Sequence, residues 1–183
     1  MNEKTFNIIS NGIFTSTVIN CITVFGNVWL TTEDKNSRFK SFSKEDCRRL
    51  QVLQNQVLRL KLRASKYTPL VQLITESGEL SIHQLVAYHT LLQVHKTILC
   101  KKPDYLAKNL SLNVPKNGQI FPHRQIHTIT VNRNKSISRS AFMYRGAKLW
   151  NQLPLELKNC QTTQKFKSLV KKWVSDKITV RPL

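Results

Sequence analysis

The side chains of this 183-residue chain that could do chemistry are mostly basic. The sequence holds 29 lysines and arginines against 10 aspartates and glutamates, which gives a formal charge of +19 and a pI near 10.2. No acidic residue occurs between Asp104 and Glu156, whereas basic residues continue through that interval. Such an excess favours a polyanionic partner, with nucleic acid ahead of an anionic membrane surface. A charged surface kept only for solubility is the alternative.

Two parts of the chain would supply contacts to a nucleic-acid backbone. One is the acid-free interval, and the other is a lysine-rich helix predicted near the C-terminus. The residues predicted to bind nucleic acid are Arg124, Arg133, Lys135, Arg139, Arg145, Lys148, Lys165, Lys167, Lys171 and Lys172. Because contacts of this kind go to phosphates, we expect binding that tolerates any base sequence, in RNA or DNA.

Groups that could carry catalysis are scarce. The four aspartates are far apart and fall in predicted loops or at helix ends, so no carboxylate pair is expected to hold two magnesium ions. The sequence also lacks a phosphate-cradling glycine loop and a zinc-protease H-E-x-x-H motif. We therefore expect no enzymatic activity, no cofactor and no small-molecule substrate.

Metal-binding patterns are absent as well. The four cysteines form no C-x-x-C pair, which argues against a zinc knuckle or a disulfide framework and favours reduced thiols in the cytosol or nucleus. His83, His89 and His95 are six residues apart on one predicted helix, so successive rings point about 120° apart. They are expected to be buried or interfacial histidines and not ligands of one ion.

Hydrophobic periodicity and capping signals predict the elements that position these side chains. The fold class expected is mainly α, a bundle of amphipathic helices with at most a small β-hairpin or short sheet. Helices are predicted near residues 6–30, 44–63, 69–77, 82–100, 143–152 and 163–176, with an extended segment around Ile126–Val131. The length predicts one domain over residues 1–183. Within it we expect a helical part at 6–110, an irregular basic segment at 111–139 and closing helices at 140–176.

Several of these helices have recognisable ends or faces. Ser43 with Asp46, and Ser81 with Gln84, have the spacing of capping boxes, in which each side chain bonds the backbone of the other residue. Pro69 and Gly78 are typical of a helix start and a helix stop. Two faces are predicted to be apolar, one made of Cys47, Leu50, Leu53, Val57 and Leu60, the other of Phe166, Leu169, Val170 and Trp173.

The segment Asn11–Leu30 is the nearest approach to a membrane span. A span needs about 20 predominantly apolar residues, and six serines, threonines and asparagines interrupt this one. A buried amphipathic helix is the favoured interpretation, and no membrane partner is expected.

The most patterned stretch is "SRSAFMYRGAKLWNQLPLELK", residues 138–158. Its aromatic and leucine side chains suit a packed core, whereas Arg145 and Lys148 suit phosphates. From the residues alone, both interpretations stay open, and both can hold together.

The order of motifs along the chain resembles a known family. "VFGNVW", "LQVLQNQVLRL", "TPLVQLITESGELSIHQLVAYHTLLQVHKTI", "KKPDYL" and "SAFMYRGAKLWNQLPLELKN" followed by "FKSLVKKWV" are similar to the region after the polymerase core in reverse transcriptases of non-LTR (LINE-type, jockey-like) retrotransposons. The resemblance extends from about Phe6 to Asp176. It implies thumb and post-thumb helices that steady template and nascent strand, beside the polymerase core.

The resemblance also has a consequence for activity and for the closing motif. The fingers, the palm with its metal-binding aspartates and the endonuclease of the family have no counterpart in this sequence. The resemblance implies that Phe142, Tyr144, Leu149, Trp150 and Leu153 dock the last helix on the earlier ones. Three functions stay open, namely a non-catalytic nucleic-acid-binding part of a reverse transcriptase, a host-adopted protein-interaction module, and a translated relic without function.

Overall fold

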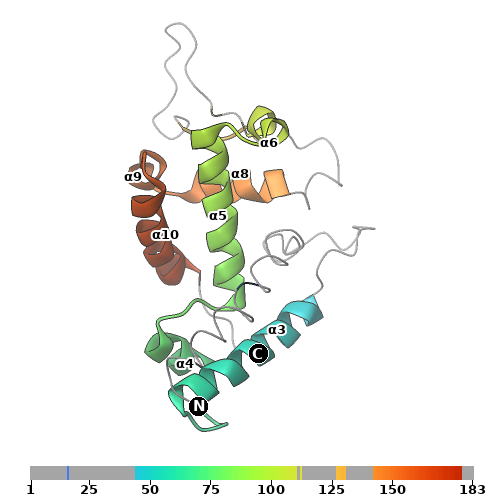
Figure 1. Ribbon diagram of the computed structural model, residues 1–183, viewed down its shortest axis with the longest axis vertical. Helices are drawn as coiled ribbons and strands as arrows, with labels where there is room; N and C mark the ends of the chain where they lie inside the picture. Colours follow the sequence, from blue (N-terminus) through green and yellow to red (C-terminus); the bar gives the residue numbers. More distant parts are fainter. Residues whose placement is uncertain (1–15, 17–43, 111, 113–126, 131–141, 179–183) are drawn as a thin grey trace, which may run out of the picture.

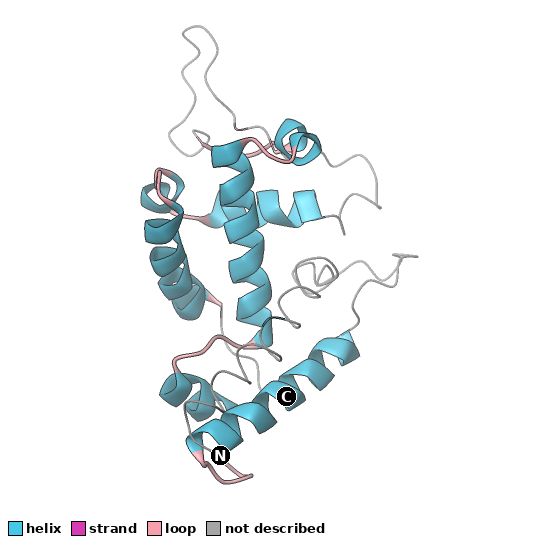
Figure 2. Ribbon diagram, viewed as in Figure 1, coloured by secondary structure: helices cyan, strands magenta, loops and turns pink. Residues whose placement is uncertain are grey.

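The computed structural model describes residues 16, 44–110, 112, 127–130 and 142–178 (Figure 1). The helices in these residues are α3 (Lys44–Leu62), α4 (Leu70–Ser77), α5 (Ile82–Cys100), α6 (Asp104–Asn109), α8 (Phe142–Gln152), α9 (Leu155–Lys158) and α10 (Thr163–Lys177). Figure 2 shows no strand in the described part of the chain. The extended pairing found there is one antiparallel bridge between Leu112 and Ile129. The predicted mainly α-helical fold is confirmed.

Helix α5 is the centre of the arrangement (Figure 1). Helix α10 lies beside it and runs in the opposite direction. Two contacts fix this register: the rings of His95 and Phe166 stack with centroids 3.8 Å apart, and Gln84 Nε2 donates to the carbonyl of Ile178 at 2.8 Å. The largest buried cluster joins α5 to α8 and α10 through Leu91, Val94, Leu149, Trp150, Phe166, Val170 and Val174. Burial of these side chains is the main favourable contribution to the packing of the three helices.

Helix α8 crosses α5 closely because a glycine lies at the crossing. A Cβ atom built on Gly146 would lie 2.6 Å from Cγ2 of Val94 and 3.9 Å from Cγ2 of Thr90. The first separation is well below carbon–carbon van der Waals contact, which begins near 3.5 Å. The missing side chain of Gly146 therefore sets the distance between these two helices.

Helix α3 buries a different face from the one that its apolar residues predict. Cys47 and Leu58 are buried, but so are Gln51, Gln54 and Asn55, whereas two leucines of the predicted apolar face are exposed. The buried amides are satisfied, because Gln54 Nε2 donates to the carbonyl of Leu80 at 2.8 Å and Gln51 Oε1 accepts from the amide of Ile82 at 2.9 Å. Hydrogen bonds to Leu80 and to the start of α5 thus help to orient α3, together with the burial of Leu58.

Most of the predicted helix ends agree with the structure. Ser81 and Gln84 form the predicted capping box, and Gly78 ends α4 in the left-handed conformation with φ at 63°. Helix α5 ends at Cys100, as predicted; Lys101 after it is left-handed, and Pro103 is the N-cap of α6. Helices α6 and α9 both follow a proline and were not predicted, because each is shorter than two turns and shows no hydrophobic periodicity.

Some predictions fall where the structure gives no description. The helix near residues 6–30 lies outside the described residues except for Ser16, and the side chains of the Ser43–Asp46 cap also lie outside them. The predicted strand at Ile126–Val131 is described only over residues 127–130, where Ile129 makes the single bridge.

Candidate nucleic-acid interface

The four predicted lysines of α10 are exposed on the surface of the bundle. Phe166, Val170 and Val174 form the buried face of this helix; the predicted Leu169 is 38% exposed, so Val174 replaces it. At 100° per residue, Lys167 and Lys171 lie on one flank of the buried face, and Lys165 and Lys172 lie on the side of the helix away from it. The exposed surface of α10 therefore carries four ammonium groups over about two helical turns.

Lys96 of α5 lies near Lys167 of α10, because both act on the same histidine. His89 is half-buried, and burial lowers its pKa, as do the positive charges of Lys167 and Lys96. Both lysines thus lie near the same imidazole, although one belongs to α10 and the other to α5. Lys96 follows His89 by seven residues, which places both on one face of α5. An anion bound there would offset the repulsion between the two lysines and would favour the protonated form of His89.

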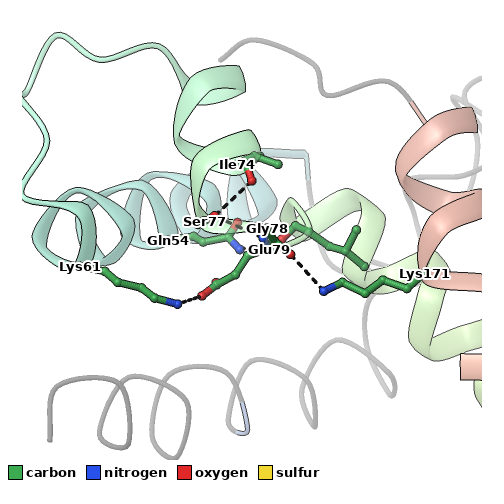
Figure 3. Close-up of polar contacts among 8 residues, drawn as sticks. Gln54, Lys61, Ile74, Ser77, Gly78, Glu79 and Lys171 are labelled. Atoms are coloured by element: carbon green, nitrogen blue, oxygen red, sulfur yellow. Dashed lines mark hydrogen bonds and ion pairs between the residues drawn. The ribbon is translucent and has the colours of Figure 1, made fainter. Parts of the chain in front are cut away.

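Lys171 has a structural contact of its own (Figure 3). Its Nζ donates a hydrogen bond to the carbonyl of Gly78 at 3.0 Å, at the C-terminal end of α4. A cation at this end of a helix also interacts favourably with the helix dipole. Glu79, the residue after Gly78, forms an ion pair with Lys61 of α3 at 2.7 Å. The hydrogen bond of Lys171 therefore connects α10 to the α4–α5 turn, so this lysine has a structural role besides any contact with a phosphate.

The two predicted basic residues of α8 differ in their exposure to solvent. Lys148 is exposed, whereas Arg145 is only 1% exposed. Burial lowers the pKa of Arg145 to about 10, because the charged guanidinium loses contact with water. The prediction that Arg145 touches a phosphate does not fit this position, because no bulky anion can reach a side chain inside the folded core.

The patterned stretch 138–158 is mainly a packing element where the structure describes it. Trp150 Nε1 donates to the carbonyl of His127 at 2.9 Å. Asn151 bonds both backbone groups of Ile129, accepting from its amide at 2.8 Å and donating to its carbonyl at 3.0 Å. Leu149, Trp150 and Leu153 are buried, as the packing interpretation predicts, and Phe142 packs against them half-buried.

The remaining predicted contacts are not placed. Arg124, Arg133, Lys135 and Arg139 lie outside the described residues, so their part in the interface stays a prediction. Sequence reasoning missed Lys96, which the structure adds to the lysines of α10. Its position seven residues after His89 was the available signal, but a single lysine on an otherwise apolar helix does not stand out without knowledge of the α10 register.

Other kinds of site find no support among the residues that the structure describes. That part of the chain has no group of three histidine, cysteine or acidic side chains able to hold a metal ion. Over the same residues, no helix combines the length and apolarity that crossing a bilayer requires. The chain matches no protein family, no curated protein and no solved structure.

Proposed function

We propose that this chain is a basic, sequence-tolerant RNA- or DNA-binding module, a non-catalytic thumb-like part of a non-LTR retrotransposon reverse transcriptase. The observation that carries the proposal is the exposure of Lys165, Lys167, Lys171 and Lys172 along α10, on a chain with a formal charge of +19. The resemblance of the ordered motifs to the region after the polymerase core supports it. The missing paired aspartates support a non-catalytic role, and cytosol or nucleus is the proposed location.

The arrangement of α10 suits a phosphate backbone better than a single small anion. Its four lysines are exposed and are spread along about two turns of the helix. Lysine acts as a flexible point charge, so a row of lysines follows a backbone without reading bases. Binding of this kind has dissociation constants of about 10⁻⁴ to 10⁻⁶ M at physiological salt.

The salt dependence of binding tests the proposal. Fluorescence anisotropy with labelled RNA and DNA across a salt series should give a steep log–log slope, to which each neutralised phosphate adds about 0.9 on duplex DNA and about 0.7 on single strands. Replacing Lys165 and Lys172 by alanine should flatten this slope by about 1 to 2 units. These two lysines are preferred to Lys171, because loss of its bond to Gly78 would also loosen the fold.

A matched control separates local contacts from total charge. Arg63 and Lys66 are exposed near the end of α3 and remove the same two charges when replaced by alanine. This control pair should change the slope less than the α10 pair does. A folded wild-type protein that binds neither polymer at low salt, or binds with no salt dependence, contradicts the proposal. Equal effects of the two pairs would mean that α10 is not the contact surface.

A further inference from the structure

Helix α3 carries an apolar seam that the described residues leave partly uncovered. Leu50, Leu53, Val57 and Leu60 are spaced by three, four and three residues, which places them on one seam along the helix. Leu53 is 48% exposed and Leu60 is 68% exposed, whereas Leu50 and Val57 are half-buried. We call these four residues the outer seam. The exposed leucines cost free energy as long as water covers them.

One edge of the outer seam is basic, and the other edge is packed. Arg49 and Gln56 are exposed and seven residues apart, so they lie in one row beside the leucines, and the exposed Arg63 follows directly after the end of α3; we call these three residues the arginine row. Glu45 is the acidic side chain that contacts this row, but it shares its carboxylate between Arg48 and Arg49, at 2.9 and 3.3 Å. The row therefore keeps a net positive charge next to an apolar stripe.

Charge decides which partner fits this surface. A second copy of the chain carries the same formal charge of +19 and the same arginines beside its seam, and like charges oppose pairing. The segment Asn11–Leu30 of the chain itself is apolar but has no acidic residue to meet the arginines. A phosphate backbone would meet the arginines but gain nothing from the leucines.

We propose that the outer seam docks an amphipathic helix of another protein, one with apolar residues spaced by three and four and acidic residues beside them. The leucines of α3 would pack against the apolar stripe of that helix, and Arg49 and Arg63 would pair with its carboxylates. Helix α3 has 19 residues and so is about 28 Å long, which accommodates a partner helix of nearly three heptads. This surface lies on α3 and is separate from the lysines of α10.

A designed peptide provides the probe. It has three heptads with leucine at positions a and d and glutamate at e and g, so that charge repulsion keeps it from pairing with itself. One comparison peptide carries lysine at e and g, and a second keeps the glutamates but has serine in place of leucine. Anisotropy of the labelled peptides with the full-length protein, at physiological ionic strength, should show clear binding of the first peptide alone.

Protein variants locate the binding. Leu53→Gln with Leu60→Gln should weaken binding of the acidic leucine peptide by about tenfold or more, because two partly exposed leucines no longer gain burial. Leu155→Gln with Leu169→Gln is the matched control, since these leucines are 46% and 38% exposed on α9 and α10. Arg49→Ala with Arg63→Ala should weaken binding and reduce the preference over the lysine peptide.

Each of the following results would overturn the proposal. Equal binding of the serine peptide would mean that charge alone attracts it to a basic protein, and equal binding of the lysine peptide would mean that the arginine row selects nothing. Loss of helical circular dichroism in the Leu53→Gln, Leu60→Gln variant would mean that the chain itself covers the outer seam. If light scattering shows that the wild-type protein is a dimer and that the Leu53→Gln, Leu60→Gln variant is a monomer, the outer seam binds a second copy of the chain. Absence of any peptide binding would also refute it.

Discussion

Replacing Gly146 by alanine probes the packing that holds α8 on α5. A glycine inside an exposed helix usually gains stability from this change, by about 1 kcal/mol, because alanine has the better helix propensity. Here the new Cβ would lie 2.6 Å from Cγ2 of Val94. Val94 is fully buried and β-branched, so its side chain has little freedom to move away.

The two effects have opposite signs, and the structure indicates which is larger. Overpacking a dense core by one methyl group costs about 1 to 3 kcal/mol, and a separation this short favours the upper part of that range. After the gain in helix propensity is subtracted, Gly146→Ala should lower the free energy of unfolding by about 1 to 2 kcal/mol. In a Val94→Ala background the obstructing atom is gone. The same substitution should then raise the free energy of unfolding, by up to about 1 kcal/mol.

Urea unfolding followed by circular dichroism measures both values. The four proteins of the cycle are the wild type, each single variant and the double variant, and the sign of the Gly146→Ala effect is compared between the two backgrounds. Gly78→Ala is the control, because no atom lies within 4 Å of its added Cβ but its φ is 63°. That variant should lose about 1 kcal/mol from backbone strain, whatever residue 94 is. A stabilising Gly146→Ala in the wild-type background, or the same destabilisation in both, would refute the packing argument.

Three further results are expected. Burial lowers the pKa of His95 despite the hydrogen bond between its Nε2 and the Cys160 carbonyl, so the unfolded state binds a proton at a higher pH than the folded state does. The free energy of unfolding should therefore be greatest above about pH 6.5, the pKa of an unperturbed histidine, and should fall below that pH. Urea titrations at several pH values should show a weaker pH dependence for His95→Gln. Arg145→Met should leave the salt slope of nucleic-acid binding unchanged, because the side chain is only 1% exposed. Asn151→Ala should cost about 1 to 3 kcal/mol in urea unfolding, because both backbone groups of Ile129 lose their partner.

The sequence predicted the helices better than it predicted the faces they bury. The helix predicted at 82–100 has those bounds in the structure, and the one predicted at 163–176 ends one residue later. Such helices depend on local spacing and caps, which the sequence contains directly. The orientation of α3 depends on Gln51 and Gln54, whose partners are backbone groups about thirty residues away. No local pattern distinguishes these buried amides from exposed ones.

The candidate interface shows the same division. Exposure of the α10 lysines follows from their position opposite an apolar stripe, which the sequence contains. The burial of Arg145 could not be predicted, because it depends on how α8 packs in the folded chain and because arginine is ordinarily exposed. The hydrogen bond of Lys171 to Gly78 joins residues 93 positions apart and required the tertiary structure.

Chemical footprinting of lysines most directly tests whether α10 binds nucleic acid. Limited acetylation followed by mass spectrometry compares the reactivity of each lysine with and without RNA or duplex DNA at low salt. We expect protection of Lys165, Lys167 and Lys172, with loss of that protection at high salt, while Lys66 on the far α3–α4 turn keeps its reactivity. Unchanged reactivity of the three α10 lysines in the presence of a saturating nucleic acid would contradict the proposed function.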